Sequence, residues 1–205
     1  QTSPDRILSD YGGSLLIREL QLPLHNPLTD LRLSEWLEER KGNFSKAMAG
    51  VVAEDTPGDD TEAGRGTIGV VALDQNGQIV AGTSTGGKGF ERVGRVSDSA
   101  MPAGNYATAQ AGISCTGIGE DIIDECLAAR IVVRVTDGLS LHDAFHRSFK
   151  EAESRHRDFG AIGIDNIGTI AWGKNCDILL AAYHNGDRIQ DTLEAPLGCQ
   201  VGSEG

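Results

Sequence analysis

The sequence predicts an α+β fold, in which helices and antiparallel strands form separate layers. Two apolar strands are followed by two helices and then by further strands, an order that differs from the strand–helix–strand repeat of a parallel sheet. The chain has 205 residues, 39% of them hydrophobic, which is enough for one domain with a substantial core. Its 27 glycines indicate many tight turns. We therefore expect a single layered domain over residues 1–205.

The first part of the chain differs from the rest. Residues 1–50 show a helical pattern, with Leu31, Trp36 and Leu37 spaced among charged residues. Residues 51–66 are rich in acidic residues and glycine and poor in apolar ones. This composition predicts an exposed, flexible linker.

A β-hairpin follows the linker. The segments TIGVVALD and QIVAGTSTG read as apolar strands on either side of a Gln-Asn-Gly loop. A three-residue hairpin loop needs a left-handed residue at its end, and Gly77 meets that need. In the resulting register Thr67 lies opposite Thr85, whereas a two-residue Asn-Gly turn would place these side chains on opposite faces. Thr83 is expected to be an ordinary β-branched strand residue.

Local patterns predict the remaining elements. AQAGISC is expected to be a strand that leads into the turn TGIGE, with a helix near residues 120–135. Ser140 is the expected N-cap of a second helix. FGAIGID and TIAWGK predict a second hairpin, and CDILLAAYHNGDRIQ adds a strand. The last segment, APLGCQVGSEG, is expected to be a loose tail.

Composition argues against several classes of protein. The net charge of −12 and the pI near 4.7 disfavour nucleic acid and anionic membrane surfaces as partners, because both attract clustered Lys and Arg. No run of apolar residues is long enough to span a membrane. The four cysteines form no C-x-x-C pair, so no metal or other cofactor is expected. The start, QTSPDRILSD, lacks the features of a signal peptide, and we expect a reduced, cytoplasmic protein.

The hairpin suggests a nucleophile. A threonine hydroxyl needs a base beside it, and the residue's own α-amino group serves once the preceding peptide bond is cut. A free α-amine has a pKa of about 8, close to the pH at which a general base works best. We therefore expect self-cleavage between Gly66 and Thr67, where glycine tolerates a strained backbone, with Thr85 facing the new nucleophile.

Two further segments offer binding groups. Arg95 and Asp98 carry opposite charges in one loop, so they suit the carboxylate and the ammonium of an amino acid. In SCTGIGE, the hydroxyl of Thr116 and the backbone N–H groups of Gly117 and Gly119 suit an oxyanion hole. A surface ion pair and a phosphate-binding turn are the simpler alternatives. The turn lacks a third glycine and a following lysine, which disfavours phosphate.

Four ordered motifs resemble one known family. GTIGVVALDxxG, AGTSTGG, GRVSDS and SCTGIGE are similar, in order and spacing, to the motifs of the plant-type, threonine-dependent asparaginases and isoaspartyl peptidases, a group of N-terminal nucleophile hydrolases. The resemblance is strong over residues 67–185 and looser over residues 7–66. It implies a four-layer αββα sandwich, a remnant of an α subunit over residues 1–66, a β subunit over residues 67–205, and a homodimer of processed units.

The resemblance implies catalytic roles on the hairpin and on the strand that ends at TGIGE. It implies that Thr67 is the nucleophile and the new N-terminus, and that Thr85 assists it. Thr116 and Gly117 would stabilise the oxyanion. The implied reaction is hydrolysis of the asparagine side-chain amide or of isoaspartyl peptide bonds. The implied substrates, asparagine and isoaspartyl dipeptides, are small molecules.

The resemblance also implies a recognition pocket, and here the sequence departs from the family. Arg95 and Asp98 would bind the substrate's α-carboxylate and α-amine, and Gly119 would shape the pocket. Ser97 stands where the family usually has glycine, and Ile118 replaces a polar or basic residue. A long segment that family members carry before these helices is not present, so we expect a chain that lacks its N-terminal part. The alternative is a catalytically inactive truncated relative, or a fragment that acts as a subunit or binding partner.

Overall fold

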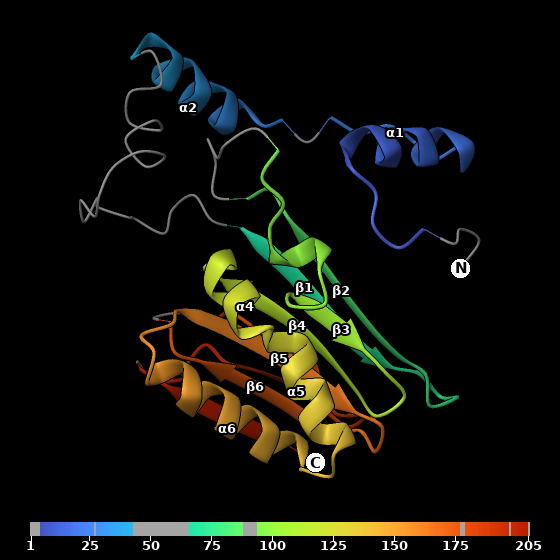
Figure 1. The fold of residues 1–205 in the computed structure, drawn as a ribbon, viewed down its shortest axis with the longest axis vertical. Helices are drawn as coiled ribbons and strands as arrows, with labels where there is room; N and C mark the ends of the chain where they lie inside the picture. The colour runs from blue at the N-terminus through green and yellow to red at the C-terminus, as the bar shows by residue number, and fades with distance from the viewer. Residues whose placement is uncertain are drawn as a thin grey trace. The chain divides into compact units, whose positions relative to one another are not determined.

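The computed structural model describes residues 5–26, 28–42, 66–87, 94–176, 179–196 and 198–204 (Figure 1). The chain divides into two compact units, one made of residues 1–60 and 90–92 and the other of residues 61–89 and 93–205. Nearly all of the predicted linker, residues 51–65, lies outside the described residues. All of the predicted site residues belong to the second unit.

The first unit contains two helices, which confirms the helical pattern. Helix α1 spans Asp10–Glu19 and helix α2 spans Asp30–Lys41. Thr29 caps α2, since its side chain accepts a hydrogen bond from the backbone of Arg32. Neither helix buries a residue, and Trp36 is 40% exposed. The apolar stripe is therefore helical but uncovered within the described part of the chain.

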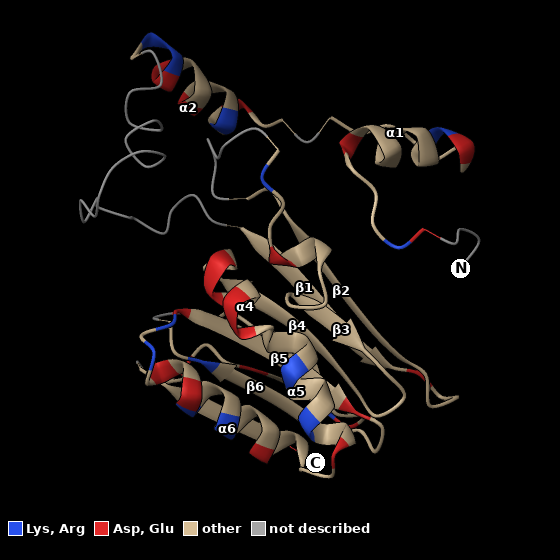
Figure 2. Cartoon of the chain, viewed as in Figure 1, with Lys and Arg blue, Asp and Glu red and all other residues tan. Residues whose placement is uncertain are grey.

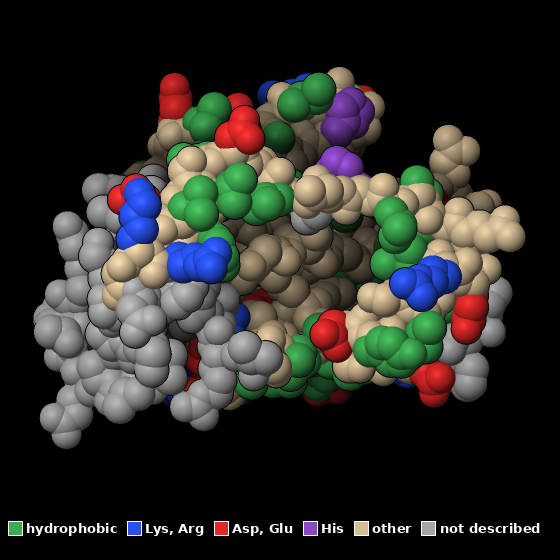
Figure 3. All heavy atoms as spheres, turned by 90° about the horizontal axis from the view of Figure 1, so that it is seen from above, with side chains coloured by type: hydrophobic (Ala, Val, Ile, Leu, Met, Phe, Trp, Pro, Cys, Tyr) green, Lys and Arg blue, Asp and Glu red, His purple; other side chains and the backbone are tan. Residues whose placement is uncertain are grey.

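The second unit begins with the predicted hairpin. Strand β1 (Thr67–Leu73) pairs antiparallel with β2 (Ile79–Thr85), and Thr67 lies opposite Thr85. Gly77 is left-handed, with φ of 77°, at the end of the loop. The predicted loop and register are thus confirmed. One face of the hairpin carries the exposed apolar side chains of Ile68, Val70 and Val80. Hydrophobic side chains lie beside charged ones on the face of the molecule that Figure 3 shows.

A five-stranded antiparallel sheet forms the centre of the second unit, in the order β3–β4–β5–β6–β9. The strands are β3 (Asn105–Ala107), β4 (Ala111–Gly117), β5 (Phe159–Asp165), β6 (Ile170–Lys174) and β9 (Gln200–Glu204). Strand β4 contacts β1 and β2 of the hairpin. The order of strands, helices and strands agrees with the predicted mixed α and β fold.

The prediction of a loose C-terminal tail is wrong. Gln200–Glu204 forms β9 and pairs with β6 along its whole length. A Cβ atom at Gly202 would lie 2.5 Å from the ring of Trp172, so the absence of a side chain lets the strand pass close to the indole. The segment has little apolar character of its own, and its strand forms because β6 offers an unpaired edge.

Helices α4 (Gly119–Glu125), α5 (Leu127–Thr136) and α6 (Leu141–Glu153) follow β4 in the chain, and α5 and α6 cover one face of the sheet (Figure 1). The single helix expected near residues 120–135 is in fact two helices, because Cys126 adopts a left-handed conformation with φ of 47°. Ser140 caps α6 as predicted, and its hydroxyl accepts from the backbone of Asp143. The core between helices and sheet includes Phe145, Phe149 and Phe159, all fully buried.

The segment between β6 and β9 forms a small separate hairpin. Strand β7 (Ala182–His184) pairs with β8 (Ile189–Asp191), where the sequence predicted a single strand. Within the described ranges, no helix combines the length and the apolar character needed to cross a bilayer.

Candidate active site

Three hydrogen bonds surround the side chain of Thr85, opposite the start of β1. The Thr67 hydroxyl donates to the Thr85 hydroxyl over 3.4 Å, and the Thr85 hydroxyl donates to the carbonyl oxygen of Gly66 over 3.3 Å. The backbone N–H of Gly87 donates to the same Thr85 oxygen over 3.1 Å. Thr85 therefore contacts both sides of the Gly66–Thr67 peptide bond.

Thr67 and Thr116 line one pocket of about 140 Å³. Gly69 and Ser114 lie on its wall beside them, and Leu179 closes part of it. The pocket is large enough for a small amide group and a few waters, and its polar groups are mostly hydroxyls. The structure thus brings together the predicted nucleophile and the predicted oxyanion threonine.

Gly117 occupies a position that only glycine fits. Its φ is 124°, and a Cβ atom there would lie 2.5 Å from the Cα of Phe159. The next residue, Ile118, donates its backbone N–H to the carbonyl of Asp158 over 3.0 Å. The turn after β4 is therefore pressed against the start of β5.

Helix α4 is held at the same place by acidic side chains, which Figure 2 shows in red along the helix. The Asp121 carboxylate accepts from the backbone N–H of Asp158 over 2.9 Å and from the guanidinium of Arg157 over 2.8 Å. Asp158 thus binds both the turn and the helix that follows it. The turn after β4 and the start of α4 are thus both held by Arg157 and Asp158.

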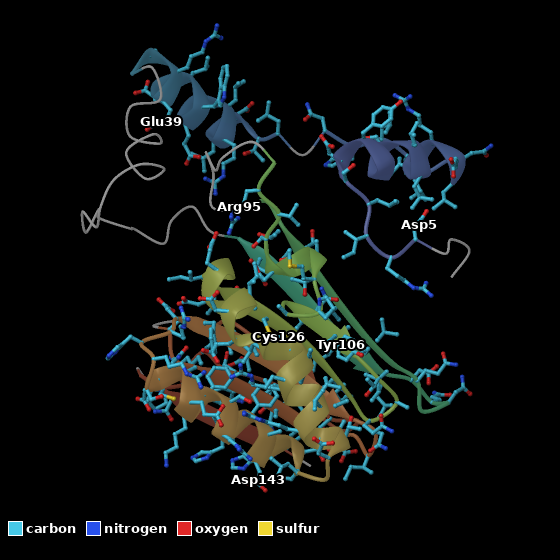
Figure 4. All side chains as sticks on the ribbon, in the orientation of Figure 1. Asp5, Glu39, Arg95, Tyr106, Cys126 and Asp143 are labelled. Carbon is cyan, nitrogen blue, oxygen red and sulfur yellow. The ribbon has the colours of Figure 1, made fainter. Side chains whose placement is uncertain are left out.

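The three predicted recognition residues converge at the N-terminus of α4. A Cβ atom at Gly119 would lie 2.8 Å from the Asp98 carboxylate, 3.1 Å from the Arg95 guanidinium and 2.4 Å from the Ser97 hydroxyl. Gly119 therefore lets two oppositely charged groups approach the same backbone. In Figure 4, Arg95 lies at the same end of the second unit as the start of β1.

Arg95 and Asp98 differ from a surface ion pair in their surroundings. Asp98 is 5% exposed, in the short 3₁₀ helix η2 (Asp98–Ala100), and accepts a hydrogen bond from the Ser97 hydroxyl over 2.7 Å. Burial raises the pKa of Asp98, while Ser97 and Arg95 act in the opposite direction. The Nε and Nη2 atoms of Arg95 both lie 2.8 Å from one oxygen of Glu120.

Sequence reasoning missed two residues of this region. Glu120 contacts Arg95 from the first turn of α4, and the acidic residue directly after TGIG is the signal that could have found it. Ser114, 2% exposed, places its hydroxyl 2.7 Å from that of Thr83. Ser114 and Thr116 are two positions apart on β4, so their side chains lie on the same face of the strand. Thr83 lies in β2, as the sequence predicts, and its hydroxyl contact with Ser114 is an addition to that expectation.

No group of three or more His, Cys, Asp or Glu side chains in the described part of the chain is placed to hold a metal ion. The site combines hydroxyls, backbone amides and the charged side chains of Arg95, Asp98 and Glu120. Such a set suits nucleophilic attack on an amide beside a charged amino-acid group.

Comparisons with known proteins agree with this class of site. A sequence model of the family described as Asparaginase matches residues 1–194. The chain belongs to this asparaginase family. It is 66% identical, over 99% of its length, to an isoaspartyl peptidase/L-asparaginase from Nostoc sp., and 60% identical, again over 99%, to a protein of the same description from Synechocystis sp..

A more distant relative and the lengths of these proteins complete the comparison. The chain is 40% identical to an isoaspartyl peptidase from Escherichia coli over 60% of this chain and 40% of that protein. It spans 64% of the length of the Nostoc relative and 61% of the Synechocystis relative.

Proposed function

We propose that the chain is part of an amidohydrolase that cuts itself between Gly66 and Thr67 and then hydrolyses the side-chain amide of L-asparagine or isoaspartyl peptide bonds. The observation that carries the proposal is the set of contacts around Thr85, which touches both the Thr67 hydroxyl and the Gly66 carbonyl. The names of the two cyanobacterial relatives support the same reaction class.

Self-cleavage uses the geometry before the peptide bond is broken. The Thr67 hydroxyl attacks the Gly66 carbonyl carbon, and the Thr85 hydroxyl, which donates to that carbonyl oxygen, stabilises the charge that develops there. The amide nitrogen of Thr67 takes up a proton and leaves as an amine. Water then hydrolyses the resulting ester, which releases the Gly66 carboxylate and restores the Thr67 hydroxyl beside the free α-amino group.

Substrate hydrolysis repeats this chemistry with the new amine as base. The amine accepts the proton of the Thr67 hydroxyl as its oxygen attacks the substrate's amide carbon. The Thr116 hydroxyl and the Gly117 N–H donate to the oxyanion, and the leaving amine or ammonia takes the proton. Water enters next and releases aspartate, or the aspartyl product of the dipeptide, from Thr67.

Recognition rests on the charged cluster at α4. Arg95 binds the substrate's α-carboxylate and Asp98 binds its α-ammonium, which orients the side-chain amide toward Thr67. Because Gly119 has no side chain, the Asp98 carboxylate and the Arg95 guanidinium both lie close to its backbone. An aspartate that is 5% exposed and lies close to a guanidinium is more consistent with this role than with a solvated surface pair.

The wider organisation belongs to the same proposal. After cleavage, residues 1–66 would belong to an α subunit and residues 67–205 to a β subunit. The two subunits would form a four-layer αββα sandwich that pairs as a homodimer. Membership of the asparaginase family supports this arrangement. We also propose a cytoplasmic location, and the free thiols of Cys115, Cys126 and Cys199 are consistent with a reducing compartment.

Turnover by the purified chain tests the proposal. Release of ammonia from L-asparagine and release of the free amino acid from a β-aspartyl dipeptide are measured for the wild type and for Thr67→Ala. We expect turnover of at least one substrate by the wild type and none by the variant. Equal turnover by both proteins would exclude Thr67 as the nucleophile, and no turnover by either would favour the inactive relative or binding partner.

A further inference from the structure

Behind the reacting threonines, a second set of side chains joins the β1–β2 hairpin to β4. Thr83 lies opposite Gly69 in the hairpin, two positions along the strands from the pair of Thr67 and Thr85 and therefore on the same face. The Thr83 hydroxyl is 2.7 Å from the Ser114 hydroxyl. Ser114 also donates to the carbonyl of Gly82 over 3.4 Å. We call Gly69, Thr83 and Ser114 the clasp.

The clasp is closely packed. Ser114 is 2% exposed, and a Cβ atom at Gly69 would lie 2.3 Å from its Oγ atom and 3.1 Å from its Cβ atom. The hairpin backbone approaches β4 this closely because position 69 has no side chain. The hairpin cannot slide along β4 without losing the hydrogen bond between the half-buried Thr83 hydroxyl and the buried Ser114 hydroxyl.

The position of the clasp connects it to the proposed chemistry. Ser114 and Thr116 are two residues apart on β4, and Gly69 and Thr67 are two residues apart on β1, so each pair shares one face of its strand. All four residues line the same pocket. A displacement of the hairpin at Gly69 therefore changes the distance between the nucleophile and the oxyanion threonine.

We propose that Ser114 is a positioning residue that acts through Thr83 and Gly69 to set the distance of Thr67 from Thr116. The inference rests on the proposed function, because it concerns the placement of the nucleophile in that reaction. The Ser114 hydroxyl bonds the Thr83 hydroxyl and the Gly82 carbonyl, and neither group reacts in the proposed mechanism. Its effect is expected on the rate of the chemical step, since a displacement of about 1 Å in a reacting group costs up to roughly 100-fold in rate.

Two single variants each remove one partner of the hydrogen bond between Thr83 and Ser114. In Ser114→Ala and in Thr83→Val we expect kcat for L-asparagine to fall about tenfold or more, with KM within about twofold of wild type. In the double variant we expect no larger loss than in the more impaired single variant, because both changes remove one interaction. Impaired cleavage at Gly66–Thr67 in these variants supports the same inference, since that step uses the same hydroxyl.

Ser148→Ala is the matched control. Ser148 is also 2% exposed, donates to the carbonyl of Ala144 over 2.6 Å and accepts from Arg134 over 2.7 Å, but it belongs to α6. We expect this variant to lower Tm without changing kcat. The control separates the loss of a buried hydroxyl from the loss of the clasp.

The outcomes separate this inference from the proposed function. If the wild type cleaves itself and turns over asparagine while Ser114→Ala and Thr83→Val keep its kcat, the clasp is only structural and the inference alone is overturned. A rise in KM at unchanged kcat also overturns it. If the wild type shows neither cleavage nor turnover, the proposed function fails and the inference fails with it.

Discussion

The hydroxyl half and the charged half of the candidate site are positioned by different physical means. Thr67, Thr85 and Thr116 stand on strands, where backbone pairing and the alternation of side chains fix each position. Arg95 and Asp98 stand in and beside the loop before β3, and their positions depend on Ser97, Glu120 and the first turn of α4. In the proposed reaction, strand pairing therefore positions the catalytic hydroxyls, whereas side-chain contacts position the substrate-binding charges.

The comparison predicts that the largest effect follows from disturbing the backbone of the hydroxyl half. Gly117→Ala places a Cβ atom 2.5 Å from the Cα of Phe159 at a φ of 124°. The turn has to move, and we expect kcat to fall by roughly 100-fold or more, the loss typical of a damaged oxyanion hole. Steady-state turnover of L-asparagine measures it.

Gly138→Ala is the control for the strain of a left-handed alanine. Gly138 has a φ of 103°, and a Cβ atom added there would meet no other atom within 4 Å. We expect a stability loss of about 1 kcal/mol with unchanged kcat. If Gly117→Ala behaved like this control, the turn after β4 would have no part in the chemistry.

Removal of the guanidinium tests the charged half. We expect Arg95→Ala to lower kcat/KM by about 30-fold or more, because a lost buried charge contact costs roughly 2 to 5 kcal/mol. Cleavage at Gly66–Thr67 should remain normal, since self-cleavage does not use the amino-acid pocket. Unchanged kinetics on both asparagine and an isoaspartyl dipeptide would exclude Arg95 as a substrate-binding residue and favour a surface ion pair.

The pH dependence of kcat/KM examines Asp98. Asp98 must be ionised to hold an ammonium, and its raised pKa places the acid limb of kcat/KM above the ordinary aspartate value of 3.8. In Asp98→Asn we expect kcat/KM to fall and this acid limb to disappear. An acid limb that persists in the variant would assign it to another group.

The same raised pKa predicts that Asp98 makes the fold less stable as pH rises, whereas a carboxylate with a lowered pKa makes it more stable. The folded chain binds the Asp98 proton more tightly than the unfolded chain, so protonation of Asp98 stabilises the fold. This stabilisation is fully present below the pKa of the unfolded chain and is lost as pH rises through the pKa of the folded chain. Denaturant unfolding of wild type and Asp98→Asn across this interval measures it. We expect the variant to lack the decrease, and an equal decrease in both proteins would contradict the assignment.

The smallest expected effect concerns Ser97. Its hydroxyl donates to the Asp98 carboxylate over 2.7 Å and so favours the ionised form. Ser97→Ala should therefore move the acid limb of kcat/KM to higher pH, with a cost of about 1 kcal/mol or less in substrate binding. A shift toward lower pH would mean that the hydroxyl stabilises the protonated acid instead.

The two halves also differ in how far the sequence predicts them. The length of the Gln-Asn-Gly loop determines the pairing of Thr67 with Thr85, so local information is sufficient. The contact of Arg95 with Glu120 is not predictable in this way, because it depends on how a loop and a helix meet 25 positions apart in the chain. The same holds for Ser114 and Thr83, which meet only when the hairpin packs on β4.

Two errors in the fold have similar causes. The break between α4 and α5 is a single left-handed residue, Cys126, and nothing in its side chain marks it in the sequence. Strand β9 pairs with the open edge of β6, so it depends on a distant partner more than on its own apolar content. Within the hairpin and at the Ser140 cap, by contrast, local turn and capping chemistry predicts the structure correctly.

The identity of the first residue after Gly66 in the mature protein tests the central claim most directly. The purified chain is incubated and its products are analysed by intact mass and N-terminal sequencing, beside Thr67→Ala and Thr67→Ser. We expect two fragments from the wild type, the second beginning at Thr67, cleavage also in the serine variant, and a whole chain in the alanine variant. A wild type that stays one chain, or an alanine variant that is cut at the same bond, would contradict the account.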